Sequence, residues 1–329
     1  MRALLLRQSD GTTTATVETV ANDALPDGDV LVDVSHSSLN YKDGLAVTGS
    51  GPIVRAPFPF VPGIDLAGTV VESEAEAWAP GDSVVLTGWG TGETQWGGYA
   101  TRARARAGHL VRRPDALTAE DAMWIGTAGF TAMLAFLALE DHGVEPDGGP
   151  VVVTGASGGV GSMATALLAA AGHEVHAATG SASAHAYLRA LGASQIVGRD
   201  ALAEVPDAPL GRGTWAGAVD SVGGTTLATL LATSRRHACV AACGLAGGAD
   251  LTTTVFPFIL RGVTLAGIDS NTAPGPLRQR AWDRLADAVA EGALAAVERT
   301  VIPLADVPAW AERILVGDTT GRVVVDVRA

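Results

Sequence analysis

A glycine-rich segment between an apolar strand and an apolar helix is the first feature of the sequence that could do chemistry. The segment VVVTGASGGVGSMATALL places Gly155, Gly158, Gly159 and Gly161 in a single turn. Glycines there permit a tight turn and let backbone N–H groups and a helix N-terminus approach a pyrophosphate. A second apolar stretch, EVHAATG, follows after about 20 residues, the spacing of a dinucleotide-binding unit. We therefore expect this turn to bind a dinucleotide.

The residues after that second stretch indicate which dinucleotide binds. NAD enzymes usually present Asp or Glu at this point, whereas residues 179–183 read TGSAS. Hydroxyls of Ser181 and Ser183 could donate to a 2′-phosphate, and Arg199 could supply positive charge. The pattern favours NADPH over NADH. The alternative is that the two serines cap the helix predicted at HAYLRALGA.

The elements around this turn alternate between strand and helix. A long Ala/Leu-rich helix is predicted from about Ala119, with Gly143 to end it. Strand VVVTG, helix MATALLAAAG, strand EVHAATG, helix HAYLRALGA, strand QIVGR, strand WAGAVDSV, helix TLATLLATSR and strand HACVAACG follow in order. This order predicts a parallel, doubly wound α/β sheet, a Rossmann domain.

The rest of the chain predicts a second, β-rich domain made of two separate segments. Residues before about 120 read as short strands with turns at Pro62-Gly63 and Pro80-Gly81, and helices look scarce there. The tail predicts a helix, a strand, a helix and a final strand GRVVVDV that rejoins this domain. We expect residues 1–121 and 270–329 to form the β-rich domain and residues 122–269 the inserted Rossmann domain.

Composition excludes several classes of protein. A net charge of −13 disfavours nucleic-acid and anionic-membrane partners. Only two cysteines occur, Cys239 and Cys243, which rules out a disulfide framework and a four-cysteine zinc lobe; we expect both to be buried in a strand and turn. No signal-like segment and no apolar run of about 20 residues is visible, so we expect a cytoplasmic protein.

Six strings resemble the medium-chain dehydrogenase/reductases, and within them the acrylyl-CoA reductase branch of the zinc-free, quinone-oxidoreductase-like group. They are SSLNYKDGLAVTG, PFVPGIDLAGTV, IGTAGFTAMLA, VTGASGGVGS, VAACGLAGG and TTVFPFILRGV, and they span nearly the whole chain. The resemblance implies that the β-rich domain is GroES-like. It also implies a homodimer.

The same resemblance bears on metal chemistry. Zinc-dependent relatives carry a cysteine ligand near SSLNYKD and a histidine ligand near PGIDLAG. This chain has Ser, Leu or Asn at the first place and Gly63, Ile64 and Asp65 at the second. Because thiolate and imidazole are missing there, we expect no catalytic zinc.

Site residues carried over from the resembled family form a cofactor-binding set and one candidate acid. The resemblance implies cofactor contacts at Asn40, Tyr41, Thr127, Gly158, Gly159, Val160, Gly161, Ser162, Ser181, Ala182, Ser183, Arg199, Leu245, Ile259 and Ser270. Close relatives tend to have a basic residue where Ser181 stands, so Arg199 would supply more of the 2′-phosphate recognition. Tyr41 is the candidate proton donor, with a pure cofactor or packing contact as its alternative role.

The activity implied is NADPH-dependent reduction of the carbon–carbon double bond of a small enoyl thioester, acryloyl-CoA to propanoyl-CoA. Such a reaction needs a hydride, stabilisation of a developing enolate oxygen, and a proton. Two alternatives stay open: a quinone or general enone reductase, and a non-catalytic NADPH-binding protein.

Overall fold

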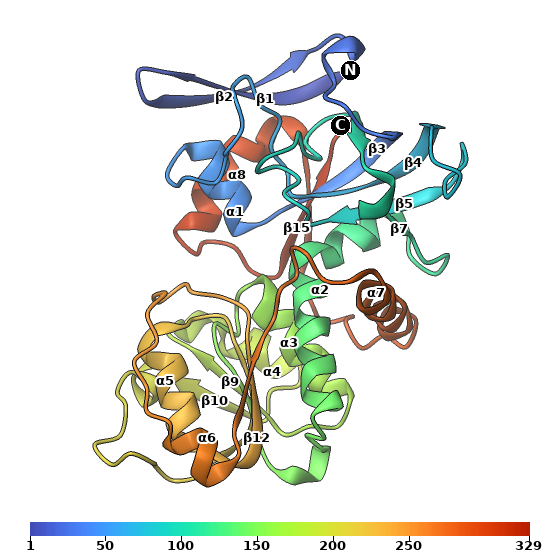
Figure 1. Ribbon diagram of the computed structural model, residues 1–329. Helices are drawn as coiled ribbons and strands as arrows, with labels where there is room; N and C mark the ends of the chain where they lie inside the picture. The colour runs from blue at the N-terminus through green and yellow to red at the C-terminus, as the bar shows by residue number, and fades with distance from the viewer. The chain divides into compact units, whose positions relative to one another are not determined.

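The computed structural model describes residues 1–329 and divides into two compact units (Figure 1). The β-rich unit comprises residues 1–127, 270–287 and 298–329. The parallel-sheet unit comprises residues 128–269 and 288–297. These units differ from the expected domains in two places, because residues 122–127 group with the β-rich unit and residues 288–297 with the parallel-sheet unit.

The β-rich unit is built on a seven-stranded sheet with the order β14-β15-β3-β4-β5-β7, to which β6 adds by pairing with β3. Its strands are β3 (Val30–Leu39), β4 (Asp65–Ser73), β5 (Ser83–Thr87), β6 (Arg102–Ala105), β7 (Val111–Arg112), β14 (Arg299–Pro303) and β15 (Arg322–Asp326). A separate hairpin joins β1 (Arg2–Ser9) to β2 (Thr12–Thr19). Because β15 pairs antiparallel with β3, the end of the chain completes the sheet that its beginning starts, which confirms the predicted discontinuous domain.

Three helices belong wholly or mainly to this unit, α1 (Tyr41–Thr48), α7 (Gly275–Ala290) and α8 (Val307–Leu315). Helix α1 is the single α-helix before residue 119, so helices are scarce there as expected. It packs against α8 so closely that a Cβ at Gly44 would lie 2.8 Å from Cγ2 of Ile314. The core of the unit is apolar, with Leu4, Leu6, Phe60 and Tyr99 fully buried.

The parallel-sheet unit has six strands in the order β10-β9-β8-β11-β12-β13, all parallel. They are β8 (Val151–Val153), β9 (Val175–Thr179), β10 (Gln195–Gly198), β11 (Trp215–Asp220), β12 (Ser234–Ala242) and β13 (Thr264–Gly267). The helices are α3 (Gly159–Ala170), α4 (His185–Ala190), α5 (Gly224–Thr233) and α6 (Phe256–Arg261). Counted from β8 the order is 3-2-1-4-5-6, which is that of the Rossmann fold. The predicted α/β fold class is confirmed.

Helix α2 (Ala119–Asp141) is the longest helix, and it spans the boundary between the units. Its helical geometry is interrupted at Gly126, where φ is 50° and ψ is −160°. By length and composition it could cross a membrane, contrary to the expectation that no such apolar run exists. However, 89% of its most apolar window is buried inside the protein, as in the core helix of a globular domain. As expected, Gly143 follows its end with a left-handed φ of 84°.

Candidate active site

The glycine-rich turn leaves the carboxyl end of β8 and opens helix α3. Because α3 begins at Gly159, the N–H groups of its first residues have no carbonyl partner within the helix, and no side chain caps them. A Cβ at Gly161 would lie 2.3 Å from the carbonyl oxygen of Gly155, so only glycine lets the helix start this close to the turn. The neighbours of β8 are β9 and β11, and this switch point of the sheet is where dinucleotides bind.

A buried aspartate that the sequence did not suggest fixes the neighbouring loop. Asp220 ends β11, and its carboxylate accepts hydrogen bonds from the Thr154 hydroxyl at 2.6 Å and from the Gly223 N–H at 2.8 Å. Ser162, predicted as a cofactor contact, is buried. Its hydroxyl donates to the Gly159 carbonyl and its N–H to the Gly158 carbonyl, so its polar groups shape the turn itself.

The predicted 2′-phosphate residues lie together beyond the end of β9. The hydroxyls of Ser181 and Ser183 are 2.8 Å apart and exposed. The Arg199 guanidinium lies beside Gly180, the residue before Ser181, since a Cβ at Gly180 would be 2.8 Å from its Nη2. No carboxylate forms an ion pair with it. Neither serine caps the following helices through its side chain, so the capping alternative is wrong. Ala182, between the serines, is also exposed.

Two further predicted cofactor contacts of this unit are apolar and exposed. Leu245 lies in the loop after β12 and is 66% exposed, and Ile259 lies in α6 and is 69% exposed. The loop of Leu245 is tied to the end of β11, because the N–H of Ala246 donates to the Ser221 carbonyl and that of Gly247 to the Val222 carbonyl.

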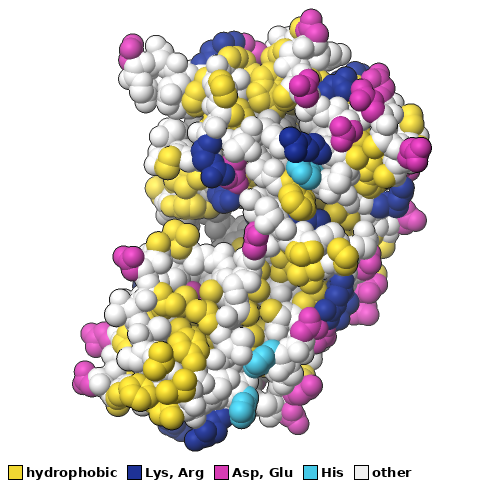
Figure 2. Space-filling view, viewed as in Figure 1, with side chains coloured by type: hydrophobic (Ala, Val, Ile, Leu, Met, Phe, Trp, Pro, Cys, Tyr) yellow, Lys and Arg dark blue, Asp and Glu magenta, His cyan; other side chains and the backbone are white.

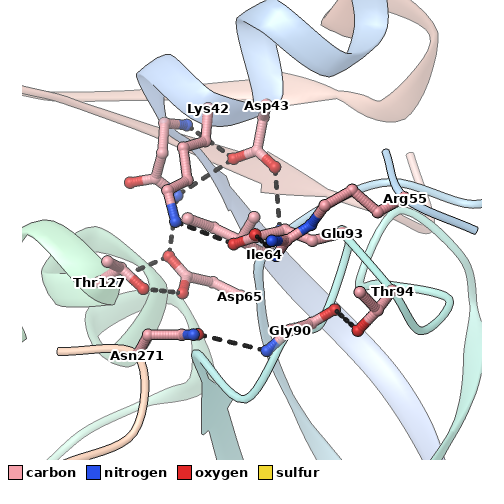
Figure 3. A network of polar contacts seen from close by, with 11 residues as sticks. Lys42, Asp43, Arg55, Ile64, Asp65, Gly90, Glu93, Thr94, Thr127 and Asn271 are labelled. Atoms are coloured by element: carbon pink, nitrogen blue, oxygen red, sulfur yellow. Dashed lines mark hydrogen bonds and ion pairs between the residues drawn. The ribbon is translucent and has the colours of Figure 1, made fainter. Parts of the chain in front are cut away.

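In the β-rich unit, the buried carboxylate of Asp65 accepts hydrogen bonds from three residues, two of which, Asn40 and Thr127, are predicted site residues (Figure 3). Its Oδ2 accepts from the Ser38 hydroxyl at 2.5 Å and from the Asn40 amide at 2.9 Å. The N–H and hydroxyl of Thr127 donate to Oδ2 and Oδ1 at 2.8 and 2.5 Å. A Cβ at Gly126 would lie within 2.8 Å of Oδ2, so the kink in α2 brings backbone directly against this group.

A second buried carboxylate, Asp43, lies on the other side of Asn40. It accepts from the Asn40 N–H at 2.9 Å, from the Asn40 amide at 3.1 Å and from the Ile64 N–H at 2.9 Å. Burial, together with the charge of Asp65, raises the pKa of Asp43 to about 7 despite these donors. Arg322 donates from Nη2 to the Asn40 Oδ1 at 3.1 Å, so every polar atom of that amide is engaged.

Tyr41 follows this network directly as the first residue of α1. Its side chain is 56% exposed, and its hydroxyl makes no hydrogen bond within the protein. Tyr41 therefore starts from a fixed backbone, and its hydroxyl has no partner within the protein. Ser270, the last predicted contact, lies in the β-rich unit, where its carbonyl accepts from Arg278 Nη2 at 3.2 Å.

The side chains at the place of the zinc ligands do not suit a zinc ion. Asp65 is the nearest metal-binding group there, and four protein hydrogen bonds already occupy its oxygens. No group of three or more His, Cys, Asp or Glu side chains in the structure could hold a metal. Cys239 is buried in β12 and Cys243 is half-buried after it, as expected for structural thiols.

A glycine loop at the switch point of such a sheet, joined to a β-rich unit, defines a two-domain dinucleotide-binding fold. Two family models match the chain: the alcohol dehydrogenase GroES-like domain over residues 26–115 and the zinc-binding dehydrogenase domain over residues 159–290. The chain belongs to the medium-chain dehydrogenase/reductase superfamily, and its full-length relatives include acrylyl-CoA reductases.

Three comparisons define this relationship. The chain is 52% identical over 327 residues to the probable acrylyl-CoA reductase AcuI of Escherichia coli, covering 99% of this chain and 100% of that protein. It is 52% identical over 322 residues to acrylyl-CoA reductase AcuI of Ruegeria pomeroyi, covering 98% and 97%. The crystal structure of the yhdH oxidoreductase of Salmonella enterica in complex with NADP superposes with a TM-score of 0.96, at 52% identity and 99% coverage of both chains.

Proposed function

We propose that this protein is an NADPH-dependent oxidoreductase that reduces the carbon–carbon double bond of acryloyl-CoA to give propanoyl-CoA. The observation that carries the proposal is the full-length, 52% identity to two acrylyl-CoA reductases. The structure supports it with a glycine-rich turn at the start of α3, the Arg199 guanidinium beside the end of β9, and a phenol that follows a buried polar network.

NADPH is the cofactor that the residues fit. Exposed hydroxyls of Ser181 and Ser183 and the unpaired Arg199 guanidinium provide donors and charge for a 2′-phosphate, and no carboxylate in the TGSAS segment repels it. The homologous yhdH oxidoreductase of Salmonella enterica was crystallised with NADP.

The chemistry divides between cofactor and protein. When bound, the nicotinamide supplies the hydride for the β-carbon of the thioester. The Tyr41 hydroxyl is free to donate a proton to the α-carbon or a hydrogen bond to the enolate oxygen. Asn40, Asp43 and Asp65 do not reach out to the substrate; they hold the start of α1 so that Tyr41 keeps one position.

A steady-state comparison tests the proposal. NADPH oxidation is followed with acryloyl-CoA, crotonyl-CoA and a benzoquinone, and propanoyl-CoA is identified by mass spectrometry. We expect the highest kcat/KM with acryloyl-CoA. A higher value with the quinone would reverse the proposal, and tight NADPH binding without turnover of any acceptor would indicate a non-catalytic binding protein.

A quinone or general enone reductase is the second candidate. One relative favours it: the putative quinone oxidoreductase YhfP of Bacillus subtilis is 41% identical over 309 residues, covering 94% of this chain and 93% of that protein. The quinone arm of the same experiment decides between the two, because a quinone accepts a hydride without protonation at carbon.

We further propose a homodimer formed through the parallel-sheet unit. Strand β13 is an edge strand that pairs only with β12. Three apolar side chains at α6 are exposed, Val255 just before the helix and Phe256 and Leu260 within it; Figure 2 shows the apolar area around α5 and α6. Sedimentation equilibrium should give twice the chain mass, and Leu260→Glu should shift the equilibrium toward monomer. A monomeric wild type would contradict this.

A further inference from the structure

Two cations of the β-rich unit share a single carboxylate. Lys42 Nζ lies 2.9 Å from Oε1 of Glu93, and Arg55 Nη2 lies 2.8 Å from Oε2 of the same side chain (Figure 3). The three side chains together carry one net positive charge. This local excess is notable in a protein whose net charge is −13.

Several other basic side chains of the unit are each paired with a carboxylate or a backbone carbonyl. Arg7 pairs with Glu18 and Arg112 with Asp82, one cation to one carboxylate. Arg299 contacts two carboxylates. In β6, Arg104 donates to the Gly28 carbonyl.

The shared carboxylate is buried while both cations reach solvent. The Glu93 side chain is 9% exposed, whereas those of Lys42 and Arg55 are 48% and 61% exposed. An ammonium has three N–H donors and a guanidinium five, and each group uses one on Glu93. The remaining donors make no hydrogen bond within the protein and are available to an anion.

The position of Glu93 is fixed before any ligand arrives. The Arg55 N–H donates to the Glu93 carbonyl at 2.8 Å, and the Glu93 N–H donates to the Gly90 carbonyl at 3.0 Å. Gly90 has a φ of 75°, and its N–H donates to the Asn271 side chain at 3.2 Å (Figure 3). Because Glu93 already holds Lys42 and Arg55 in place, binding an anion to these two cations costs little conformational entropy.

Lys42 is also next to the proposed reacting residue. It follows Tyr41 in the first turn of α1, and consecutive helical residues point in directions about 100° apart. A ligand whose reacting end meets Tyr41 can therefore direct a different part of itself toward Lys42 and Arg55.

We propose that Lys42 and Arg55, held by Glu93, form an anion subsite that binds a phosphate group of the coenzyme A carrier. This rests on the proposed function, in which the substrate is an acyl-CoA. The phosphates of an acyl-CoA carry several negative charges, and the protein is itself acidic, so a local pair of cations is needed to attract and hold the substrate.

The test compares two substrates that share the reacting group. Acryloyl-CoA carries phosphates, whereas the acryloyl thioester of N-acetylcysteamine carries none. In Arg55→Gln the ratio of kcat/KM for the first substrate to that for the second should fall about tenfold, and in the Lys42→Met, Arg55→Gln double variant it should fall further. Arg55→Lys should restore part of the ratio. Arg112→Gln, which removes the same charge from a balanced pair, should leave the ratio unchanged.

Separate outcomes overturn the subsite and the proposed function. An unchanged ratio in the double variant, with normal thermal unfolding, removes the subsite. A rise in the NADPH KM, with equal losses for both thioesters, assigns the cations to a cofactor phosphate instead. If the wild type reduces neither thioester, the proposed function fails. The subsite is then tested by titration calorimetry with CoA and with pantetheine, which lacks the phosphates on the adenosine side. The subsite requires that Arg55→Gln weakens the binding of CoA and not that of pantetheine.

Discussion

The Asp65 carboxylate accepts both polar hydrogens of Thr127, the backbone N–H at 2.8 Å and the hydroxyl at 2.5 Å. This pair joins the first residue of β4 to the point where α2 changes direction after Gly126. Ser38 and Asn40 donate to the same carboxylate. Asp65 therefore fixes the start of β4, the segment between β3 and α1, and the kink of α2 relative to one another.

Asp65→Asn should destabilise the protein strongly. The substitution keeps the shape but turns one acceptor oxygen into an N–H donor that faces other buried donors. We expect a loss of about 3 to 5 kcal/mol in the free energy of unfolding, the scale of a broken buried charged network, measured by urea denaturation. Asp82→Asn, at an exposed pair with Arg112, is the matched control and should change little. An Asp65→Asn variant as stable as the wild type would show that the network does not hold the site.

Asp43 should make stability fall as the pH rises. Its pKa is raised in the folded protein from 3.8 to about 7, so between these values the native state holds a proton that the unfolded state has released. This stabilisation is complete below pH about 4 and is lost as the pH passes about 7, a total of up to about 4 kcal/mol. Unfolding free energies measured from pH 4 to 8 should decline more steeply in the wild type than in Asp43→Asn. Parallel curves would contradict the assignment.

Arg199→Ala should weaken NADPH binding selectively. Loss of a charge-assisted contact to the 2′-phosphate costs about 1.5 to 3 kcal/mol, roughly ten- to a hundredfold in affinity. The KM for NADH should stay nearly the same, since NADH has no such phosphate. Arg189→Ala, which removes an exposed arginine from α4 of the same unit, serves as the control. Equal use of NADH and NADPH by the wild type would argue against the role of Arg199.

Tyr41→Phe tests the proton donor. The variant keeps the ring and loses only the hydroxyl, so turnover of acryloyl-CoA should fall about a hundredfold or more while NADPH affinity changes little. A quinone acceptor should be affected much less, because it needs no proton at carbon. If both acceptors slow equally, or the thioester is reduced at nearly the original rate, the hydroxyl contacts the cofactor and water supplies the proton.

The protein should purify without stoichiometric zinc and keep its activity in the presence of chelators. The reason is that the Asp65 oxygens are saturated by protein donors and that neither thiolate nor imidazole lies beside them. Elemental analysis is the measurement. One tightly held zinc per chain, lost together with activity, would be incompatible with this prediction.

The parts of the fold that follow a local pattern could be predicted from the sequence. The strand, glycine turn and helix around Gly155 to Ser162 are contiguous in the chain, so their periodicity and spacing predict both structure and ligand. Arg199 could be predicted to approach Ser181 because the end of one parallel strand lies next to that of its neighbour. The tail strand β15 was likewise visible as an apolar run.

Local patterns could not predict the polar network. Asn40 and Arg322 are 282 residues apart, and a single arginine at the start of an apolar strand reads as its solvent-exposed end. In the sequence, Asp65 stands out only as a residue that is not histidine, and no local pattern marks Asp43 as buried. Helix α1 was missed because its eight residues are too few to show a clear helical period. A buried group becomes recognisable only when tertiary structure shows what surrounds it.

The placement of β15 has a consequence for how the protein is made. Strand β15 lies inside the sheet of the β-rich unit, between β14 and β3, and brings Arg322 to Asn40. Until the ribosome has added β15, strand β3 lacks one of its neighbours in the sheet, whereas all strands of the parallel-sheet unit have been synthesised earlier. The parallel-sheet unit can therefore fold earlier during translation, whereas the β-rich unit that carries Tyr41 can complete its sheet only after β15 has been synthesised.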